Sequence, residues 1–431
     1  MLLVHIEHPS PRARFALDHV LRNMIGWDVR FTGSMEEFRS ADAPKIHYGR
    51  AIVDERAFHL HASGWLEEEG VRPFEPRIGK SDGIPVLFPN YHGHDPFAGT
   101  FYLISRYEEY LEDDRDAHGR LPSGSHFMVK HGIERIPVVD HWALQLADQL
   151  RSDFPALREP SRRYRHVATI DVDNGLKYRG RPKWRQFAAL LRDLLKFDLA
   201  EVKARIAVMT GKRKDPFAVL EEMLQIAAPF TSGSIAFFLT KGGGKFDHAA
   251  DPLHPAMRNA IGAFASTARI GIHPSYESSR RPAMIGEEIE LLSGIAGIPI
   301  TTSRQHFLRW KMPDTLRELE QAGIRQEHSI GFSDRSGFRA GTCTPFPWYD
   351  LHQERVSAIT MHPFATMDSA FYDQQKRSPH EASAEMISMA EKVRAVNGNY
   401  ISVWHDRFLS GSGQWRGWPE VFREVIEKAA P

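Results

Sequence analysis

The sequence contains very little cysteine. Cys343 is the one cysteine among 431 residues, which excludes an intrachain disulfide framework and a zinc knuckle built from cysteine ligands. If the protein binds a metal ion, the ligands must be His, Asp or Glu side chains. The chain has 22 histidines, but histidine is common on surfaces and in hydrogen-bonded cores, so the number alone assigns no function.

The chain also lacks an excess of charge of either sign. It has 55 Lys and Arg against 55 Asp and Glu, which argues against a surface shaped as a whole to bind nucleic acid. It has no uninterrupted run of about 18 apolar residues, and the opening MLLVHIEHPS places an acid and a proline where a signal peptide needs an apolar stretch. We therefore expect a cytoplasmic protein with no nucleic-acid partner.

The length favours two domains, because 431 residues exceed a typical single domain. Residues 1–160 mix short apolar runs with a segment, 95–114, in which apolar residues recur at helical spacing. The polar stretch REPSRRYR at 158–165 is typical of a linker. We predict a smaller N-terminal α/β domain of unknown role at 1–160 and a second domain at 161–431.

From residue 166 onward, strand-like runs alternate with helix-like runs. Seven runs have the apolar character of buried strands: 166–173, 234–240, 269–274, 298–303, 328–332, 357–363 and 400–406. Regular alternation implies parallel strands with helices outside them, as a barrel or as an open doubly wound sheet. About seven strands favour the barrel, and we predict a distorted (β/α)7-type barrel, complete or incomplete.

Polar residues stand where several of these strands end. They are Asp171, Asp173, His273, Arg304, His306, His405 and Asp406. Catalytic groups of parallel α/β folds collect at the carboxyl ends of the strands. We therefore expect these side chains to share one edge of the sheet, although they are far apart in the sequence.

The segment TIDVD places two carboxylates, Asp171 and Asp173, at a strand end. Such a pair is costly to bury unless a cation or a proton compensates it. One carboxylate can bind a metal ion while the other acts as general base toward water. Alternatively, one of them caps the loop that follows. His273 can likewise ligate zinc or be a hydrogen-bonded histidine at a strand end.

Two further positions would complete a hydrolytic site. Arg304 could bind a substrate carboxylate or phosphate, orient the base aspartate, or form a salt bridge with the following helix. His405 is placed to protonate a leaving amine, with Asp406 holding its tautomer. A base, an acid and a Lewis-acidic metal together suffice for amide hydrolysis.

These motifs resemble those of the polysaccharide deacetylase family, in the branch with an Asp-x-Asp first motif. The resemblance implies a distorted barrel and hydrolysis of an N-acetyl or related acyl group of an amino sugar, with one divalent ion, expected to be zinc. By resemblance, Asp171 is the catalytic base, and Asp173 and His273 are metal ligands. Arg304 corresponds to the arginine of the third motif, and His405 to the histidine after the last strand.

One position departs from the family pattern. Where the second motif usually has another histidine four residues after the first, this chain has Glu277. The third ligand is either Glu277 or His306. We prefer His306, because HPSY resembles a stiff turn more than the start of a helix that would stack residues four apart. The resemblance also places Asp334 and Arg339 among residues that tune the base and line the site.

Two other functions stay open on the sequence alone. The altered second motif would suit a catalytically inactive carbohydrate-binding or scaffold protein that retains the fold. A glycoside hydrolase is the other alternative, but carboxylates two residues apart on one strand are poorly placed to flank a glycosidic bond.

The segment 179–214 carries 11 Lys or Arg against three acids, within a neutral chain. Its apolar residues Trp184, Phe187, Leu191, Leu194 and Leu195 recur at three- and four-residue intervals, which predicts a largely helical insertion. The apolar face could pack on the rest of the protein while the charges are solvated. Alternatively, the insertion could make a peripheral contact with an anionic membrane surface or attract a diphosphate-linked substrate.

Overall fold

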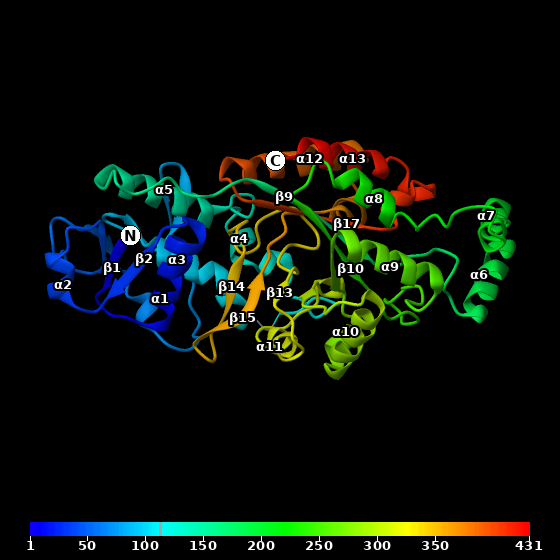
Figure 1. Cartoon of the computed structure of the whole chain (residues 1–431), viewed down its shortest axis with the longest axis horizontal. Helices are drawn as coiled ribbons and strands as arrows, with labels where there is room; N and C mark the ends of the chain where they lie inside the picture. Colours follow the sequence, from blue (N-terminus) through cyan, green and yellow to red (C-terminus); the bar gives the residue numbers. More distant parts are fainter. Residues whose placement is uncertain (112–113) are drawn as a thin grey trace.

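The computed structural model describes residues 1–111 and 114–431 (Figure 1). It is a mixed α/β structure with two large sheets. A four-stranded sheet has the order β2-β1-β3-β4, and a nine-stranded sheet has the order β14-β15-β13-β12-β11-β10-β9-β17-β16. Buried apolar side chains from both parts of the chain form one continuous core cluster.

The N-terminal segment builds the smaller sheet, whose strands are all parallel. The strands are β1 (Leu2–Ile6), β2 (Val29–Thr32), β3 (Lys45–Gly49) and β4 (Phe58–His61), followed by the short hairpins β5 (Ile78–Ser81) with β6 (Ile84–Leu87) and β7 (Pro89–Asn90) with β8 (Gly93–His94). The helices are α1 (Pro11–Asp18), α2 (Met35–Ser40), α3 (Pro96–Ile104), α4 (Phe127–Lys130) and α5 (Val138–Asp153). Helix α3 begins the helical segment predicted at 95–114, of which residues 112–113 lie outside the described residues.

The C-terminal part builds the larger sheet. Its strands are β9 (Arg165–Val172), β10 (Gly233–Phe238), β11 (Arg269–Ile272), β12 (Thr302–Ser303), β13 (Gln326–Glu327), β14 (Phe346–Asp350), β15 (Arg355–Met361), β16 (Thr366–Met367) and β17 (Asn399–His405). Its helices are α6 (Lys183–Leu195), α7 (Leu199–Met209), α8 (Leu220–Ala227), α9 (Pro255–Thr267), α10 (Ala283–Ala296), α11 (Asp314–Gln321), α12 (Pro379–Ala395) and α13 (Trp418–Lys428). Neighbouring strands are parallel except β14, which runs antiparallel to β15.

A closed barrel is not found in the described residues, although the parallel order and the alternation with helices are as predicted. The sheet ends at β14 on one side and at β16 on the other, so it is open. The short connection from β14 to β15 enforces an antiparallel edge. The prediction missed both end strands, and it placed a strand at 328–332, where the chain is buried but irregular after β13.

Along strand β9 and directly after it, apolar core residues alternate with the two aspartates of the candidate site. Ala168, Ile170 and Val172 belong to the core cluster. Asp171 and Asp173 alternate with them and therefore point to the opposite face. Residues 168–172 of β9 are all buried, so both faces of the strand are covered at this end.

The insertion at 179–214 forms a hairpin of helices α6 and α7 that stands at one end of the molecule (Figure 1), so the prediction of a largely helical segment is confirmed. The interpretation that its apolar face packs on the rest of the protein is wrong. Trp184, Phe187 and Leu195 are each about two-thirds exposed or more (67%, 69% and 72%). In the described part of the chain, neither these helices nor any other is long and apolar enough to cross a membrane.

Candidate active site

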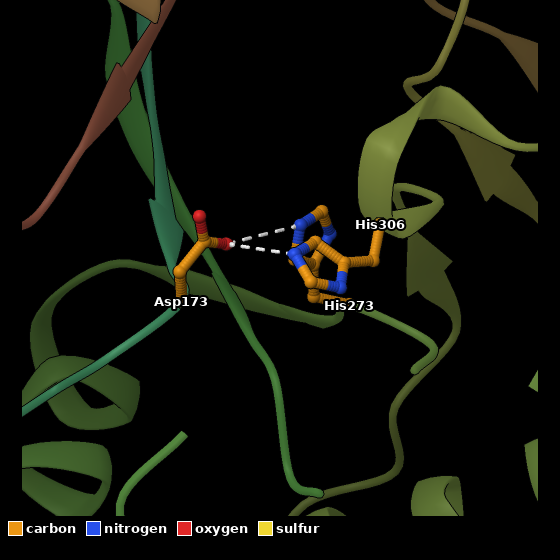
Figure 2. Close-up of side chains that lie close together, drawn as sticks. All are labelled: Asp173, His273 and His306. Carbon is orange, nitrogen blue, oxygen red and sulfur yellow. Dashed lines mark ion pairs between the residues drawn. The ribbon is translucent and has the colours of Figure 1, made fainter. Parts of the chain in front are cut away.

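Three of the predicted metal ligands meet at the carboxyl edge of the larger sheet (Figure 2). Asp173 follows β9, His273 follows β11 and His306 follows β12, and all three are buried. Nε2 of His273 lies 3.4 Å from Oδ1 of Asp173, and Nε2 of His306 lies 3.7 Å from the same oxygen. One ligand atom from each residue lies within 4.8 Å of the other two, so the three can share one ion.

The spacing of these atoms fits a divalent metal ion. Ligands about 2.1 Å from a tetrahedral ion stand about 3.4 Å from one another, close to the separations observed. Oδ1 of Asp173 is moreover buried without a hydrogen-bond partner among the described residues. A buried carboxylate oxygen without a hydrogen bond is costly, and a cation would compensate its charge. The residues present therefore fit the metal that the family resemblance implies.

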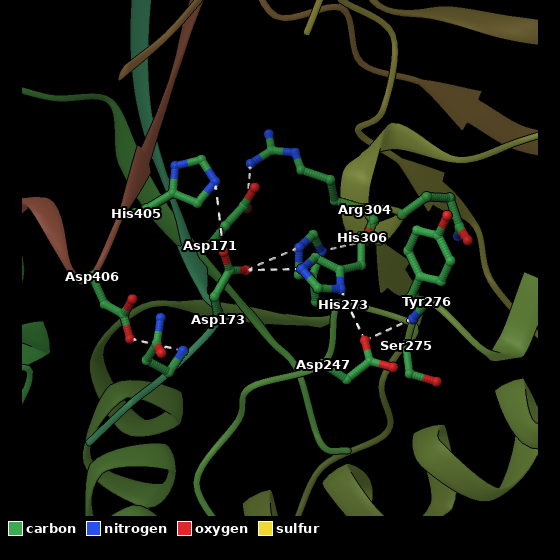
Figure 3. Close-up of polar contacts among 12 residues, drawn as sticks. Asp171, Asp173, Asp247, His273, Ser275, Tyr276, Arg304, His306, His405 and Asp406 are labelled. Carbon is green, nitrogen blue, oxygen red and sulfur yellow. Dashed lines mark hydrogen bonds and ion pairs between the residues drawn. The ribbon is translucent and has the colours of Figure 1, made fainter. Parts of the chain in front are cut away.

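A hydrogen bond at Nδ1 fixes the ring of each of the two histidines (Figure 3). His273 Nδ1 donates to the backbone carbonyl of Arg304 at 2.6 Å, and His306 Nδ1 lies 3.0 Å from Oδ1 of Asp247. These contacts leave Nε2 of each ring free to face Asp173. Asp247 also accepts from the backbone N–H of Tyr276 at 2.8 Å. Sequence reasoning missed Asp247, because it lies in an irregular loop with no local motif.

Glu277 stands outside this group. Its side chain is exposed, at the start of a short 3-10 helix. The preceding HPSY segment is a turn, as predicted, and Ser275 fixes it by donating from its backbone N–H (2.9 Å) and its hydroxyl (2.6 Å) to buried Glu288. A turn in place of a helix does not stack positions 273 and 277, so the geometry favours His306 over Glu277 as the third candidate ligand.

The local charges favour an ionised Asp173. Burial by itself would raise the pKa of Asp173, but contact with His273 and the positive charges of His306, His405 and Arg407 hold that pKa well below its usual range. Arg407 makes the shortest contact, 2.6 Å from Oδ2. Because Arg407 takes this oxygen, Oδ1 is the one left for a cation. Arg407 directly follows the predicted HD pair of WHDRF, which was the available signal for it.

Asp171 stands beside the metal-ligand group and is bound by Arg304. Arg304 donates from Nη1 to Oδ1 of Asp171 at 2.8 Å and from Nε to the carbonyl of His328 at 3.0 Å. The Arg304 side chain is fully buried. It therefore cannot reach a substrate anion, and of the three roles that the sequence left open, the contacts support orientation of Asp171.

His405 approaches the same group from β17. The pairing of β17 with β9 places His405 opposite Asp171, and Nε2 of His405 lies 3.8 Å from Oδ2 of Asp173. Its Nδ1 lies 2.6 Å from Oδ1 of Asp368, whose other oxygen accepts from the His405 backbone N–H at 2.7 Å. Burial lowers the pKa of His405, but the charge of Asp368 outweighs it and raises this pKa to about 9.

The prediction that Asp406 holds the tautomer of His405 is wrong. Asp406 instead accepts from the backbone N–H groups of Asn174 and Gly175, and so fixes the loop after Asp173 (Figure 3). The reason is that consecutive residues of an extended chain point to opposite sides. Asp368 follows the two-residue strand β16, which has no visible pattern in the sequence.

A cavity of about 170 Å³ joins these groups. Its lining includes Asp171, Asp173, His273, His306 and His405, together with His118 and Arg120 from the N-terminal segment. Arg120 reaches this wall by donating to the carbonyl of Phe307 at 3.0 Å. Sequence reasoning missed both N-terminal residues, since no motif in residues 1–160 indicated a part in the site.

Asp334 and Arg339 line a neighbouring hollow of about 230 Å³ that shares part of its wall with the cavity. Arg339 donates to Oε2 of Glu109 at 2.9 Å, and Asp334 accepts from the hydroxyl of Ser123 at 2.6 Å. Both therefore bind the N-terminal segment. Among the described contacts, neither touches Asp171.

Comparisons with known proteins find a family model that matches the N-terminal segment. Residues 2–155 match the model of a family of unknown function, DUF7033. No curated protein matches the sequence. A crystal structure of a putative polysaccharide deacetylase from Mycobacterium smegmatis is similar at 16% identity and a TM-score of 0.40, over 63% of this chain and 85% of that chain.

A second similar structure is a putative polysaccharide deacetylase involved in O-antigen biosynthesis from Bordetella bronchiseptica. It has 13% identity and a TM-score of 0.29, over 57% of this chain and 73% of that chain. TM-scores below 0.5 do not establish a shared fold. The function of this chain must therefore be inferred from its own side chains.

The contacts of the two histidines predict a graded series of metal affinities. His273→Ala removes a direct ligand and should abolish most metal binding, while Asp247→Asn loosens His306 and should weaken binding by about 10–100-fold. Zinc titration with a competing chelator measures both. The exposed Asp251→Asn is the matched control and should bind as the wild type does. Full metal occupancy in His273→Ala would show that the ligand set is wrong.

Proposed function

We propose that the protein is a metal-dependent hydrolase that removes an N-acetyl or related acyl group from an amino sugar of a polysaccharide or its precursor. One observation carries the proposal. His273 and His306 converge on Oδ1 of Asp173, a buried carboxylate oxygen that has no hydrogen-bond partner among the described residues, and Asp171 and His405 line the same cavity. The resemblance of the motifs to those of polysaccharide deacetylases supports the sugar substrate.

The proposed metal ligands are Asp173, His273 and His306. They would hold a divalent ion, with zinc as the expected identity, which when bound would supply a Lewis acid for an acyl oxygen and for water at neutral pH. The protein fixes the orientation of the two imidazole ligands, because the Arg304 carbonyl and the Asp247 carboxylate each bond the Nδ1 of one ring.

Asp171 is the proposed general base. It lines the cavity, and its partner Arg304 fixes its orientation from the buried side. A carboxylate held in this way can accept the proton of the attacking water without first having to reorient.

His405 is the proposed general acid. The contact with Asp368 fixes its Nδ1–H and raises its pKa to about 9, so the ring enters the reaction protonated at neutral pH. Its Nε2 faces the cavity beside Asp173, where it can give a proton to the departing amine. Without that proton the amine would leave as a poor, strongly basic anion.

Neither alternative function has a comparable observation in its favour. An inactive scaffold would not need Asp247 and Asp368 to fix the rings of His306 and His405. A glycoside hydrolase needs two free carboxylates on opposite sides of a bond. Here Asp171 is bound to Arg304 and Asp173 to Arg407, and both stand at the end of the same strand.

Metal removal tests the proposal directly. Purified protein should contain about one divalent ion per chain and should release acetate from members of a panel of N-acetylated amino sugars, free, oligomeric and nucleotide-linked. Chelation should remove the activity and added zinc should restore it, because the cation supplies the Lewis acid. Acetate release and metal content by mass spectrometry are the measurements.

The control is an exposed histidine variant, His380→Ala, which should retain both metal and activity. Unchanged hydrolysis in metal-free protein would rule out the proposed chemistry. Stoichiometric metal without hydrolysis of any panel member would favour the binding or scaffold function.

A further inference from the structure

The hairpin of α6 and α7 concentrates the exposed apolar surface of the protein. Nine of the sixteen large apolar side chains that are exposed in the described residues belong to it. They are Trp184, Phe187, Leu191, Leu194, Leu195, Phe197, Leu199, Ile206 and Met209. Exposed apolar side chains gathered on one element in this way mark an interaction site more often than an incidental surface.

This face is not needed to hold the hairpin together. The inner side of α7 buries Val202 and Val208, and Arg205 stacks over the Tyr178 ring at 4.9 Å. Arg205 also bridges the two helices through Oδ2 of Asp193 at 2.6 Å. These contacts stabilise the hairpin from within. The exposed apolar side chains are therefore free to contact another surface.

The acidic side chains of the hairpin have partners, whereas most of its basic side chains are exposed without an ion pair in the described part of the chain. Its three acids are all engaged: Asp193 pairs with Arg205, Asp198 caps α7, and Glu201 accepts from the Tyr178 hydroxyl and pairs with Lys177. Six exposed cations form no ion pair within the described residues: Lys183, Lys196, Lys203, Lys212, Arg213 and Lys214. The outer surface is thus apolar and strongly positive.

A basic hollow of about 700 Å³ continues this surface at the base of the hairpin. Arg179, Arg181, Lys183, Arg185 and Lys241 line it, with Asp251 as the acid in the lining. The three arginines donate to backbone carbonyls. These carbonyls satisfy their hydrogen bonds without neutralising their charge, so the hollow favours anionic groups.

We propose that the hairpin docks the protein on an anionic membrane surface, with the apolar face of α6 inserted at the headgroup boundary and the basic residues on the lipid phosphates. Exposed aromatic and aliphatic side chains beside unpaired lysines are what such a surface binds. A second copy of the chain is disfavoured as the occupant, because two hairpins that each carry an excess of eight positive charges would repel one another.

The attachment of the hairpin relates this surface to the candidate active site. Residues 174–178 link Asp173 to the insertion, and the chain returns at Asp215, whose carboxylate accepts from the backbone N–H groups of Lys177 (2.7 Å) and Tyr178 (2.9 Å). The stem is therefore closed next to the metal-ligand strand. Docking would hold the carboxyl edge of the sheet close to the lipid, and it does not depend on the reaction proposed above.

Vesicle binding tests this proposal. The full-length protein should co-sediment with vesicles that contain phosphatidylglycerol, much less with neutral phosphatidylcholine vesicles, and less at high salt. Changing Lys212, Arg213 and Lys214 to Gln should weaken binding by on the order of 100-fold, since each cation near an anionic surface contributes about fivefold. Changing Phe187, Leu195 and Phe197 to Ser should weaken it by at least about tenfold.

Matched controls remove the same charge or the same apolar character elsewhere on the surface. They are Lys80, Arg158 and Arg163 to Gln, and Ile52, Ile298 and Val356 to Ser, all at exposed positions. Both controls should bind as the wild type does. Brominated lipid should also quench part of the wild-type tryptophan fluorescence, and Trp184→Phe should remove that quenching.

Two results would overturn the proposal. One is a wild-type protein that does not bind anionic vesicles at low salt. The other is concentration-dependent self-association, measured by sedimentation velocity, that the Phe187, Leu195 and Phe197 variant abolishes while vesicle binding is unchanged. That outcome would assign the face to a second copy of the chain.

Discussion

Asp171→Asn is expected to lower the rate of acyl hydrolysis by about 10²–10⁴ while the protein keeps its metal. The amide cannot accept the proton of the attacking water, but it preserves the shape of the carboxylate beside Arg304. The metal-ligand group of Asp173, His273 and His306 is unchanged by this substitution. Steady-state kinetics on a confirmed substrate and metal analysis of the same preparation measure the two quantities.

Thermal unfolding must accompany these measurements. Arg304 is fully buried, and breaking a buried ion pair commonly costs about 3–5 kcal/mol, so the variant should melt at a lower temperature while folded at the assay temperature. Asp148→Asn, at an exposed position, is the control for the chemical change alone. Wild-type turnover in Asp171→Asn would remove Asp171 from the mechanism. Loss of metal from that variant would mean that the two aspartates have exchanged roles.

His405→Ala should lower the hydrolysis rate by about 10²–10⁴ as well, because the leaving amine then lacks its proton donor. Asp368→Asn should approach the same loss, since Asp368 fixes the tautomer of His405 and keeps it protonated. Both effects should appear in kcat more than in KM. The double variant should be little slower than His405→Ala alone, because the two residues act as one unit.

A titration of the His405 ring by NMR separates this positioning role from a general structural one. In Asp368→Asn the pKa of His405 should fall from about 9, since the carboxylate charge that outweighs burial is gone. His380→Ala again serves as the exposed histidine control. If Asp368→Asn left the His405 pKa in place, or if His405→Ala hydrolysed substrate normally, a different group would have to protonate the amine.

The sequence by itself determined which strand ends carry the candidate catalytic and metal-binding residues. Alternating apolar runs predicted parallel strands, and the polar residues directly after them had to share an edge, because parallel strands all point the same way. Asp173, His273 and His306 do meet there, with Asp171 and His405 beside them. Local periodicity likewise predicted the helices of 179–214.

The partners that hold these residues could not be predicted in the same way. Asp247 and Asp368 lie 59 and 37 positions from the histidines that they contact, in a loop and after a two-residue strand, where no local pattern exists. The adjacent Asp406 was the wrong choice, because an extended chain turns neighbouring side chains apart. His118 and Arg120 reach the cavity through contacts between segments that are distant in sequence.

Only the tertiary structure decided which surfaces the elements cover. The helical spacing of Trp184, Phe187 and Leu195 predicts an apolar face of α6 but not what covers it, and the fold leaves that face exposed. Sheet closure is decided in the same way. Seven apolar runs are compatible with a barrel, but the antiparallel β14 and the short β16 leave the sheet open in the described residues. Periodicity specifies which side of an element is apolar, whereas long-range packing specifies what covers that side.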